Sequence, residues 1–167
     1  MPTYRRRTRI DAPLDAVWEF HSRIAGLEAL TPGWTNLRIE AVQGPDGADD
    51  PEILETGTRI RLSVRPFGVG PRQTVVSVIS ARERGDGSAY FQDVMDEGPL
   101  AEWEHTHSFF ADDDATILED RVVYELPTAP GRALAPLARV GFEPLFRFRH
   151  RRTHELLDGR DTPSYTV

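Results

Sequence analysis

The segment between residues 58 and 127 alternates apolar and polar side chains with a period of two, and short turn sequences interrupt it. Near its start, Ile60, Leu62 and Val64 share one side while arginines occupy the other. This period is typical of β-strands, because successive side chains of a strand point to opposite faces of the sheet. The Gly-Asp-Gly sequence at 85–87 is a strong hairpin signal. The pattern therefore predicts five successive strands, mostly antiparallel, at 58–66, 72–84, 88–98, 100–110 and 115–127.

Two more strands are predicted nearer the N-terminus, at residues 3–10 and 34–43. The first has three arginines on one side, a pattern that favours a solvated strand face over a nucleic-acid contact. The second has Leu37, Ile39 and Ala41 on one face. With these two, the chain is expected to have about seven strands.

The stretch between these two strands has helical spacing instead. Pro13 stands near the expected helix start, and Gly26 is expected to divide the stretch into two short helices that end before Thr31 and Pro32. The apolar residues that recur at helical spacing are Val17, Phe20, Ile24 and Leu27.

Residues 132–157 have near-helical spacing and no strand alternation, which predicts one long C-terminal helix. Gly141 and Pro144 fall inside it, so we expect a kink or a break there. Together the elements predict a single α+β domain over residues 1–158, followed by a disordered tail at 159–167. The long helix is the only element large enough to cover the inner face of a curved antiparallel sheet, and this arrangement tends to leave a cavity between them.

Composition excludes several classes of site. The chain has no cysteine, so disulfides, thiolate metal sites and a cysteine nucleophile are absent. A net charge of −7 argues against nucleic acid as a general partner. There is no apolar run of about 18 residues that could span a membrane, and the basic N-terminus lacks the apolar segment of a signal peptide. We therefore expect a cytoplasmic protein.

Residues 100–127 contain a concentration of polar groups on what should be the inner face of the sheet. Trp103, His105, His107 and Phe109 alternate with an acidic and hydroxyl-bearing set, which is the solvated side. If residues 112–115 form a four-residue turn, position 111 pairs with 116, and His107 then lies opposite Asp120. The same register places His105 opposite Val122 and Trp103 opposite Tyr124. On the preceding strand, Phe91, Asp93 and Met95 are expected to share this face.

A buried group formed by Asp93, His105, His107, Asp120 and Tyr124 has several possible roles. Buried charges cost several kcal/mol unless they are paired, so the group can be a satisfied internal network that fixes strand register. It can also supply the polar contacts that orient an apolar ligand. A third role is acid–base catalysis by aspartate-oriented histidines. Two histidines with carboxylates can bind zinc or iron as well, but the H-x-H spacing is weak evidence, because strand alternation also produces it.

Two other features are less informative. His21, on the first helix, is interpreted as a surface or internally satisfied histidine. The basic and aromatic sequence at 146–154 is interpreted as a solvated helix face near a helix C-terminus rather than as a phosphate, lipid or RNA contact. The sequence contains neither a phosphate-binding glycine loop nor a nucleophile elbow.

The order of elements resembles the helix-grip fold of the START and SRPBCC superfamily, which includes polyketide cyclases, lipid-transfer proteins and birch-pollen allergens. The opening residues Ile10, Ala12, Pro13, Val17, Trp18 and Phe20 are similar to that superfamily's first strand and helix. A narrower pattern, F-x-D-x-Q-x-x-G-P-x-x-x-W-x-H-x-H-x-F followed by D-x-V-x-Y-x-x-P, resembles small SRPBCC proteins, some of them fused to nucleoside-diphosphate-sugar epimerases. The matching residues are Phe91, Asp93, Gly98, Pro99, Trp103, His105, His107, Phe109, Asp120, Val122, Tyr124 and Pro127, and Met95 replaces the glutamine of the pattern.

The resemblance implies a fold that serves both carriers and enzymes. We predict that the protein binds a small hydrophobic or aromatic molecule in a cavity between the sheet and the C-terminal helix, without a cofactor or metal. One alternative is an enzyme of cyclase or dehydratase type, with His105 and His107 as acid–base groups oriented by Asp120 and Asp93. Another is a regulatory module that acts on a protein partner. The residues predicted to contact the ligand are Phe91, Asp93, Met95, Trp103, His105, His107, Phe109, Asp120, Tyr124, Leu145 and Phe148.

Overall fold

The computed structural model describes residues 1–127 and 129–160, with the backbone alone at 129–139. Within these residues, seven strands form an antiparallel sheet in the order β1-β7-β6-β5-β4-β3-β2. Six strands, β2 to β7, follow one another in space as in sequence, and each is antiparallel to the next. The strands are β1 (Thr3–Ile10), β2 (Arg38–Gln43), β3 (Arg59–Val64), β4 (Gln73–Arg84), β5 (Ser88–Glu97), β6 (Glu102–Asp112) and β7 (Ala115–Glu125).

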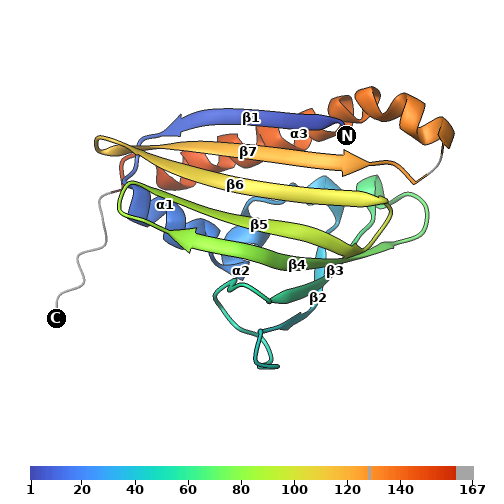
Figure 1. Ribbon diagram of the computed structural model, residues 1–167, viewed down its shortest axis with the longest axis horizontal. Helices are drawn as coiled ribbons and strands as arrows, with labels where there is room; N and C mark the ends of the chain where they lie inside the picture. The colour runs from blue at the N-terminus through green and yellow to red at the C-terminus, as the bar shows by residue number, and fades with distance from the viewer. Residues whose placement is uncertain (128, 161–167) are drawn as a thin grey trace.

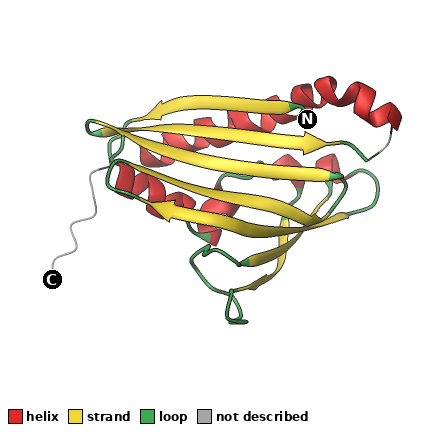
Figure 2. Cartoon of the chain, viewed as in Figure 1, coloured by secondary structure: helices red, strands yellow, loops and turns green. Residues whose placement is uncertain are grey.

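Three helices cover one face of the sheet, as Figures 1 and 2 show. Helix α1 (Leu14–His21) contacts β6 and β7, α2 (Ile24–Ala29) contacts α1, and α3 (Ala129–Leu157) contacts β1 and β7. Short 3-10 turns occupy Gly33–Thr35 and Pro66–Gly68. The predicted α+β helix-grip arrangement, with a curved sheet around a long C-terminal helix, is therefore confirmed. No helix in the described part of the chain is long and apolar enough to cross a membrane.

The division between α1 and α2 differs from the prediction. The two helices separate at Ser22 and Arg23, whereas Gly26 lies inside α2. Its role is close packing: a Cβ atom at Gly26 would collide with the backbone carbonyl oxygen of Phe20 at the end of α1. The glycine therefore allows the second helix to fold back against the first.

Other boundaries also shift. The strand predicted from residue 34 begins at Arg38, because Gly33–Thr35 form a turn and Asn36 has a left-handed backbone (φ 49°). Helix α3 begins at Ala129 and is not broken at Gly141 or Pro144. Of the predicted tail, residues 161–167 lie outside the described residues, while the backbone N–H of Gly159 donates to the carbonyl oxygen of Asp11.

The β6–β7 hairpin has the register that the sequence predicts. Asp112 pairs with Ala115, and the two-residue turn between them contains Asp113 in a left-handed conformation (φ 52°). Ala111 is therefore paired with Thr116, and His107 with Asp120. The predicted pairs His105–Val122 and Trp103–Tyr124 are confirmed by the same ladder.

The core has two parts on the helix-covered face of the sheet. The larger joins α1 to the middle of the sheet, where the Trp18 ring meets the rings of Phe91 and Phe109 at centroid distances of 6.1 and 5.7 Å. The smaller lies under α3, where Phe146 packs on Tyr4 and Phe142 packs on Tyr124. The two core parts meet at the histidines of β6, where Phe91 of the larger part stacks on His107 and Phe146 of the smaller part contacts His105.

Two helical glycines should respond oppositely to alanine. At Gly26 the new methyl group has no room, so Gly26→Ala should lower the free energy of unfolding by about 1–3 kcal/mol. At Gly141 in α3 no described atom outside the adjoining helix backbone lies within 4 Å of the new Cβ, so Gly141→Ala should raise the free energy of unfolding by about 0.5–1 kcal/mol through helix propensity. Urea denaturation of both variants tests the pair. Stabilisation by both substitutions would contradict the close approach of α1 and α2.

Candidate functional site

A cavity of about 280 Å³ lies between the sheet and the helices. Most of its wall is apolar, and the side chains come from the short helix α2 and from strands β3 and β4 as well as from the centre of the sheet. The aliphatic residues of this wall include Leu27, Leu30, Ile60, Leu62, Val75 and Ile79. Long aliphatic side chains at alternate strand positions build such a surface because they all point to one face of the sheet.

Three of the five ionisable side chains in the cavity wall lie on β5 and β6. Asp93 is contributed by β5, and Trp103, His105 and His107 by β6. His105 and His107 are buried, with 5% and 4% of their surfaces exposed. Helix α3 contributes Arg149. The cavity wall is thus mostly apolar, and its ionisable groups include two histidines of β6, an aspartate and an arginine.

Asp120, behind this wall on β7, is the centre of the histidine cluster. Its carboxylate is 2% exposed. His105 donates its Nε2–H to one oxygen at 2.8 Å, and His150 from α3 donates its Nε2–H to the other at 2.6 Å. His107 Nδ1 lies 2.8 Å from the first oxygen, at ion-pair distance but off the line of a hydrogen bond. One carboxylate therefore connects β6, β7 and α3.

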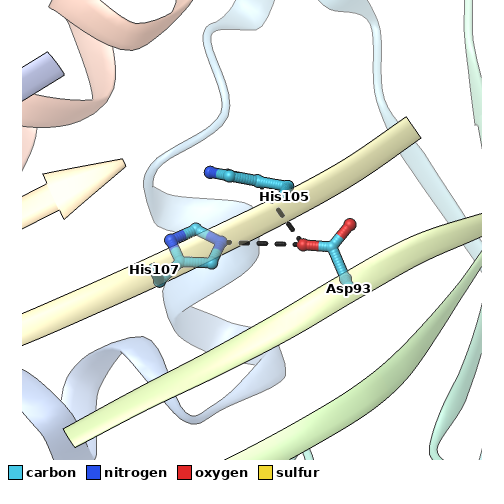
Figure 3. Close-up of side chains that lie close together, drawn as sticks. All are labelled: Asp93, His105 and His107. Carbon is cyan, nitrogen blue, oxygen red and sulfur yellow. Dashed lines mark ion pairs between the residues drawn. The ribbon is translucent and has the colours of Figure 1, made fainter. Parts of the chain in front are cut away.

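Asp93 lies on the cavity side of the same two histidines. Its Oδ1 is 3.4 Å from His105 Nδ1 and 3.7 Å from His107 Nε2, and Figure 3 shows both imidazoles turned toward this one oxygen. Its other oxygen accepts hydrogen bonds from Trp103 Nε1 at 3.2 Å and from the Ser77 hydroxyl at 3.3 Å. The two imidazole rings are thus placed between two carboxylates.

These contacts decide which forms of the groups are stable. Burial by itself raises the pKa of Asp93 and of Asp120. The contacts with the neighbouring histidines lower each pKa by more than burial raises it, so both carboxyl groups stay ionised. Burial lowers the pKa of His105, and its hydrogen bonds to Asp120 and Asp93 more than offset this, so the net shift is upward. Positive charge is therefore favoured between the two carboxylates.

Three side chains of the cavity wall or the histidine cluster were not among the predicted site residues. His21 is buried, lines the cavity and donates its Nδ1–H to the Val17 carbonyl oxygen at 2.9 Å, which agrees with its interpretation as an internally satisfied histidine. The basic sequence at 146–154 was interpreted as a solvated face, but His150 is 2% exposed and Arg149 lines the cavity. Helical spacing with Phe146 and Thr153, both fully buried, is the signal that could have placed His150 on the inner side.

The structure brings most of the predicted ligand-contacting residues to the cavity and places four elsewhere. Phe109 packs in the larger core against Trp18, Tyr124 packs in the smaller core, and Asp120 lies behind the histidines. Phe148 lies under the guanidinium group of Arg151 rather than in the cavity wall. The predicted residues that do line the cavity are Phe91, Asp93, Met95, Trp103, His105, His107 and Leu145.

Comparison with known proteins identifies the fold. No profile of a protein family and no curated protein matches the sequence. Among solved structures, a START superfamily protein from Mycobacterium smegmatis is similar, with a TM-score of 0.59, 16% identity and coverage of 92% of this chain and 98% of that one. Truncated norcoclaurine synthase from Thalictrum flavum has a TM-score of 0.65 at 17% identity, with 95% of each chain covered.

A third similar structure is the nucleoside-diphosphate sugar epimerase from Corynebacterium glutamicum, with a TM-score of 0.60 and 21% identity. The similarity covers 91% of this chain and 28% of that longer one. At these identities the similarity concerns the fold, and the fold of this chain is START-like, of the SRPBCC type. Fold alone does not assign the chemistry of the cavity.

Removing a member of the Asp120 cluster should destabilise the protein. Asp120→Asn removes the negative charge that three histidines approach and leaves one acceptor oxygen instead of two, so it should cost about 3–5 kcal/mol, as the loss of one member of a buried ion pair does. His105→Ala and His107→Ala should each cost about 1–3 kcal/mol, since each leaves a carboxylate with fewer partners. His154→Ala, at a partly exposed pair with Asp158, is the control and should cost less than about 1 kcal/mol. Urea denaturation measures all four, and unchanged stability of both His105→Ala and His107→Ala would contradict the network.

His21 should make stability depend on pH. Burial lowers its pKa to about 3, so below its ordinary value of 6.5 the unfolded chain binds a proton that the folded chain excludes. Stability should therefore fall as the pH drops from 6.5 toward 3. Between pH 7 and pH 5 the wild type should lose about 2 kcal/mol more than His21→Asn, a variant that cannot titrate. Equal losses, measured by urea denaturation at both pH values, would show that folded His21 accepts the proton.

Proposed function

We propose that the protein binds a small hydrophobic or aromatic molecule in the cavity between sheet and helices. The observation that carries this proposal is the composition of the cavity wall: apolar side chains over most of its surface, with a few polar groups that include Asp93, His105 and His107 of two neighbouring strands. Ligand sites in proteins have this composition, because apolar area supplies affinity and a few polar groups fix orientation. The START-like fold is consistent with such a role.

The volume of the cavity limits the size of the ligand. Pockets for drug-sized molecules measure about 300–1,000 Å³, and this cavity of about 280 Å³ is at the lower end of that range. A compact molecule of one or two rings fits this volume better than a long-chain lipid does. One of the similar structures is norcoclaurine synthase in complex with dopamine and hydroxybenzaldehyde, which are single-ring molecules.

The polar part of the cavity suggests how the ligand is oriented. The imidazoles of His105 and His107 can form hydrogen bonds with a hydroxyl or carbonyl group of the ligand. Arg149 can donate hydrogen bonds to a negatively charged oxygen. The ring system of the ligand is then placed against Leu27, Leu62 and the other aliphatic residues of the wall. We therefore propose a ligand with one polar, oxygen-bearing end.

Acid–base catalysis on the bound molecule is the second candidate function. It is favoured by the position of His105, whose imidazole lines the cavity and is oriented by Asp120 from behind. This pairing of histidine and aspartate holds one tautomer and stabilises the imidazolium form, as a general base requires. A cyclase- or dehydratase-type reaction would use the imidazole that faces the cavity to remove or donate the proton.

Native mass spectrometry of gently purified protein tests the binding function. We expect an adduct that is released on denaturation, and we expect Val75→Trp, which fills the cavity, to abolish it. Val78→Trp is the control, because Val78 lies on the same strand and is not part of the cavity wall. Adding the recovered compound back should raise the melting temperature of the wild type and of the control variant only.

Three results are informative beyond that expectation. An adduct retained equally by Val75→Trp and Val78→Trp would place the ligand elsewhere and contradict the proposal. A wild type with no adduct, and no thermal shift with a panel of one- and two-ring phenols, aldehydes and acids, would also contradict it and favour a role in protein interaction. A recovered compound that changes in mass on incubation with fresh protein would select catalysis over simple binding.

A further inference from the structure

Three side chains in the cavity wall direct their donor atoms at one point. Asp93 Oδ1, His105 Nδ1 and His107 Nε2 all lie within 4.8 Å of one another, and Figure 3 shows the two rings converging on the carboxylate. The three come from neighbouring strands, and the pairing of Asp93 with His105 across β5 and β6 fixes their spacing. A rigid ladder of backbone hydrogen bonds thus holds the three donors together.

The spacing of the donors is not that of good hydrogen bonds. Hydrogen bonds from N–H to oxygen are about 2.7–3.2 Å long, whereas Asp93 Oδ1 is 3.4 Å from His105 Nδ1 and 3.7 Å from His107 Nε2. A zinc ion with bonds of about 2.0–2.2 Å in tetrahedral geometry separates its donor atoms by about 3.3–3.5 Å. The observed distances are close to this separation.

The far side of each imidazole supports the same interpretation. His105 donates Nε2–H to Asp120, and His107 Nδ1 lies 2.8 Å from the same oxygen. In the neutral form of His105, which donates its Nε2–H to Asp120, the lone pair of Nδ1 faces Asp93 Oδ1, and a cation between these two atoms would be coordinated by both. An aspartate behind metal-binding histidines is a recurrent feature of metal sites, because it fixes the tautomer and the ring orientation.

We propose that Asp93 Oδ1, His105 Nδ1 and His107 Nε2 form a three-ligand site for a divalent transition-metal ion of the zinc class, with Asp120 as the positioning residue. The donor set of two imidazoles and one carboxylate suits zinc and iron(II), whereas calcium and magnesium favour oxygen donors. All three ligands line the cavity, so the remaining coordination position faces the space where a small molecule binds. Three protein ligands and one open position is the arrangement of catalytic rather than structural zinc sites.

The surrounding charge is compatible with a cation. Two carboxyl groups, those of Asp93 and Asp120, flank the histidine pair, and the cavity wall contains one arginine, Arg149. A divalent ion therefore enters a pocket whose fixed charge is negative. Arg149 also stands where it can pair with an anionic group on a molecule that occupies the open position.

The test uses the full chain without a histidine tag, stripped with a chelator and dialysed, and zinc sulfate as the probe. Isothermal titration calorimetry should show one zinc ion per chain with a micromolar or lower dissociation constant. Asp93→Asn and His107→Gln should weaken binding more than about 100-fold, because the loss of an outer-sphere partner alone costs about 10–100-fold. His154→Gln is the matched control, since His154 and Asp158 form a surface pair 2.8 Å apart that could hold zinc adventitiously.

X-ray absorption spectroscopy of the zinc-loaded wild type keeps the proposal testable if a variant fails to fold. We expect two imidazole nitrogens in the first coordination shell. No zinc binding by the wild type, one imidazole or none in the shell, or loss of binding in His154→Gln but not in Asp93→Asn would overturn the proposal. This outcome is independent of the ligand experiment, because zinc binding is measured without an organic molecule.

Discussion

The carboxylate of Asp120 holds together elements that are distant in the sequence. It is almost fully buried and has His105 and His107 on one side and His150 of α3 on the other. An isolated buried charge would cost several kcal/mol. The native packing is therefore favourable only when His105 of β6 and His150 of α3 both form hydrogen bonds with Asp120. The position of the long helix against the sheet is therefore coupled to the hydrogen bonding of one residue on β7. Apolar packing alone, which tolerates small displacements of a helix, would fix this position less sharply.

The same arrangement keeps the cavity polar on one side only. The two core clusters enclose the Asp120 group from both ends, with Phe109 and Trp18 on one side and Phe146 and Tyr124 on the other. Water has little access to Asp120, and the imidazoles that satisfy it from behind expose their other nitrogens to the cavity. A strand places alternate side chains on one face, so His105 and His107 arrive there together. On the inner face of β6, each ring thus contacts Asp120 on one side and leaves a nitrogen on the cavity side for the proposed contacts.

Much of this site follows from local sequence. The alternation of residues 102–110 assigns both histidines to one face, and the two-residue turn at Asp113 and Asp114 fixes the pairing of His107 with Asp120. His150 could not be found in the same way, because its contact with Asp120 depends on how α3 crosses the sheet, and no hairpin determines that. Gly26 shows a similar limit: its sequence context suggests a helix break, whereas the packing of α2 on α1 requires a missing side chain inside the helix.

The roles considered for the buried polar group are not exclusive, because its two carboxylates have different surroundings. Asp120 is enclosed and has hydrogen bonds to both oxygens, so a structural role accounts for it. Asp93 is more exposed, at 17% of its side chain, and its Oδ1 has only long contacts to two imidazoles. A network that served stability alone would bring this oxygen within hydrogen-bond distance of one ring, as Asp120 does. The longer contacts leave room for a further group at the cavity wall, and for this reason we place the proposed metal ion on the Asp93 side of the cluster.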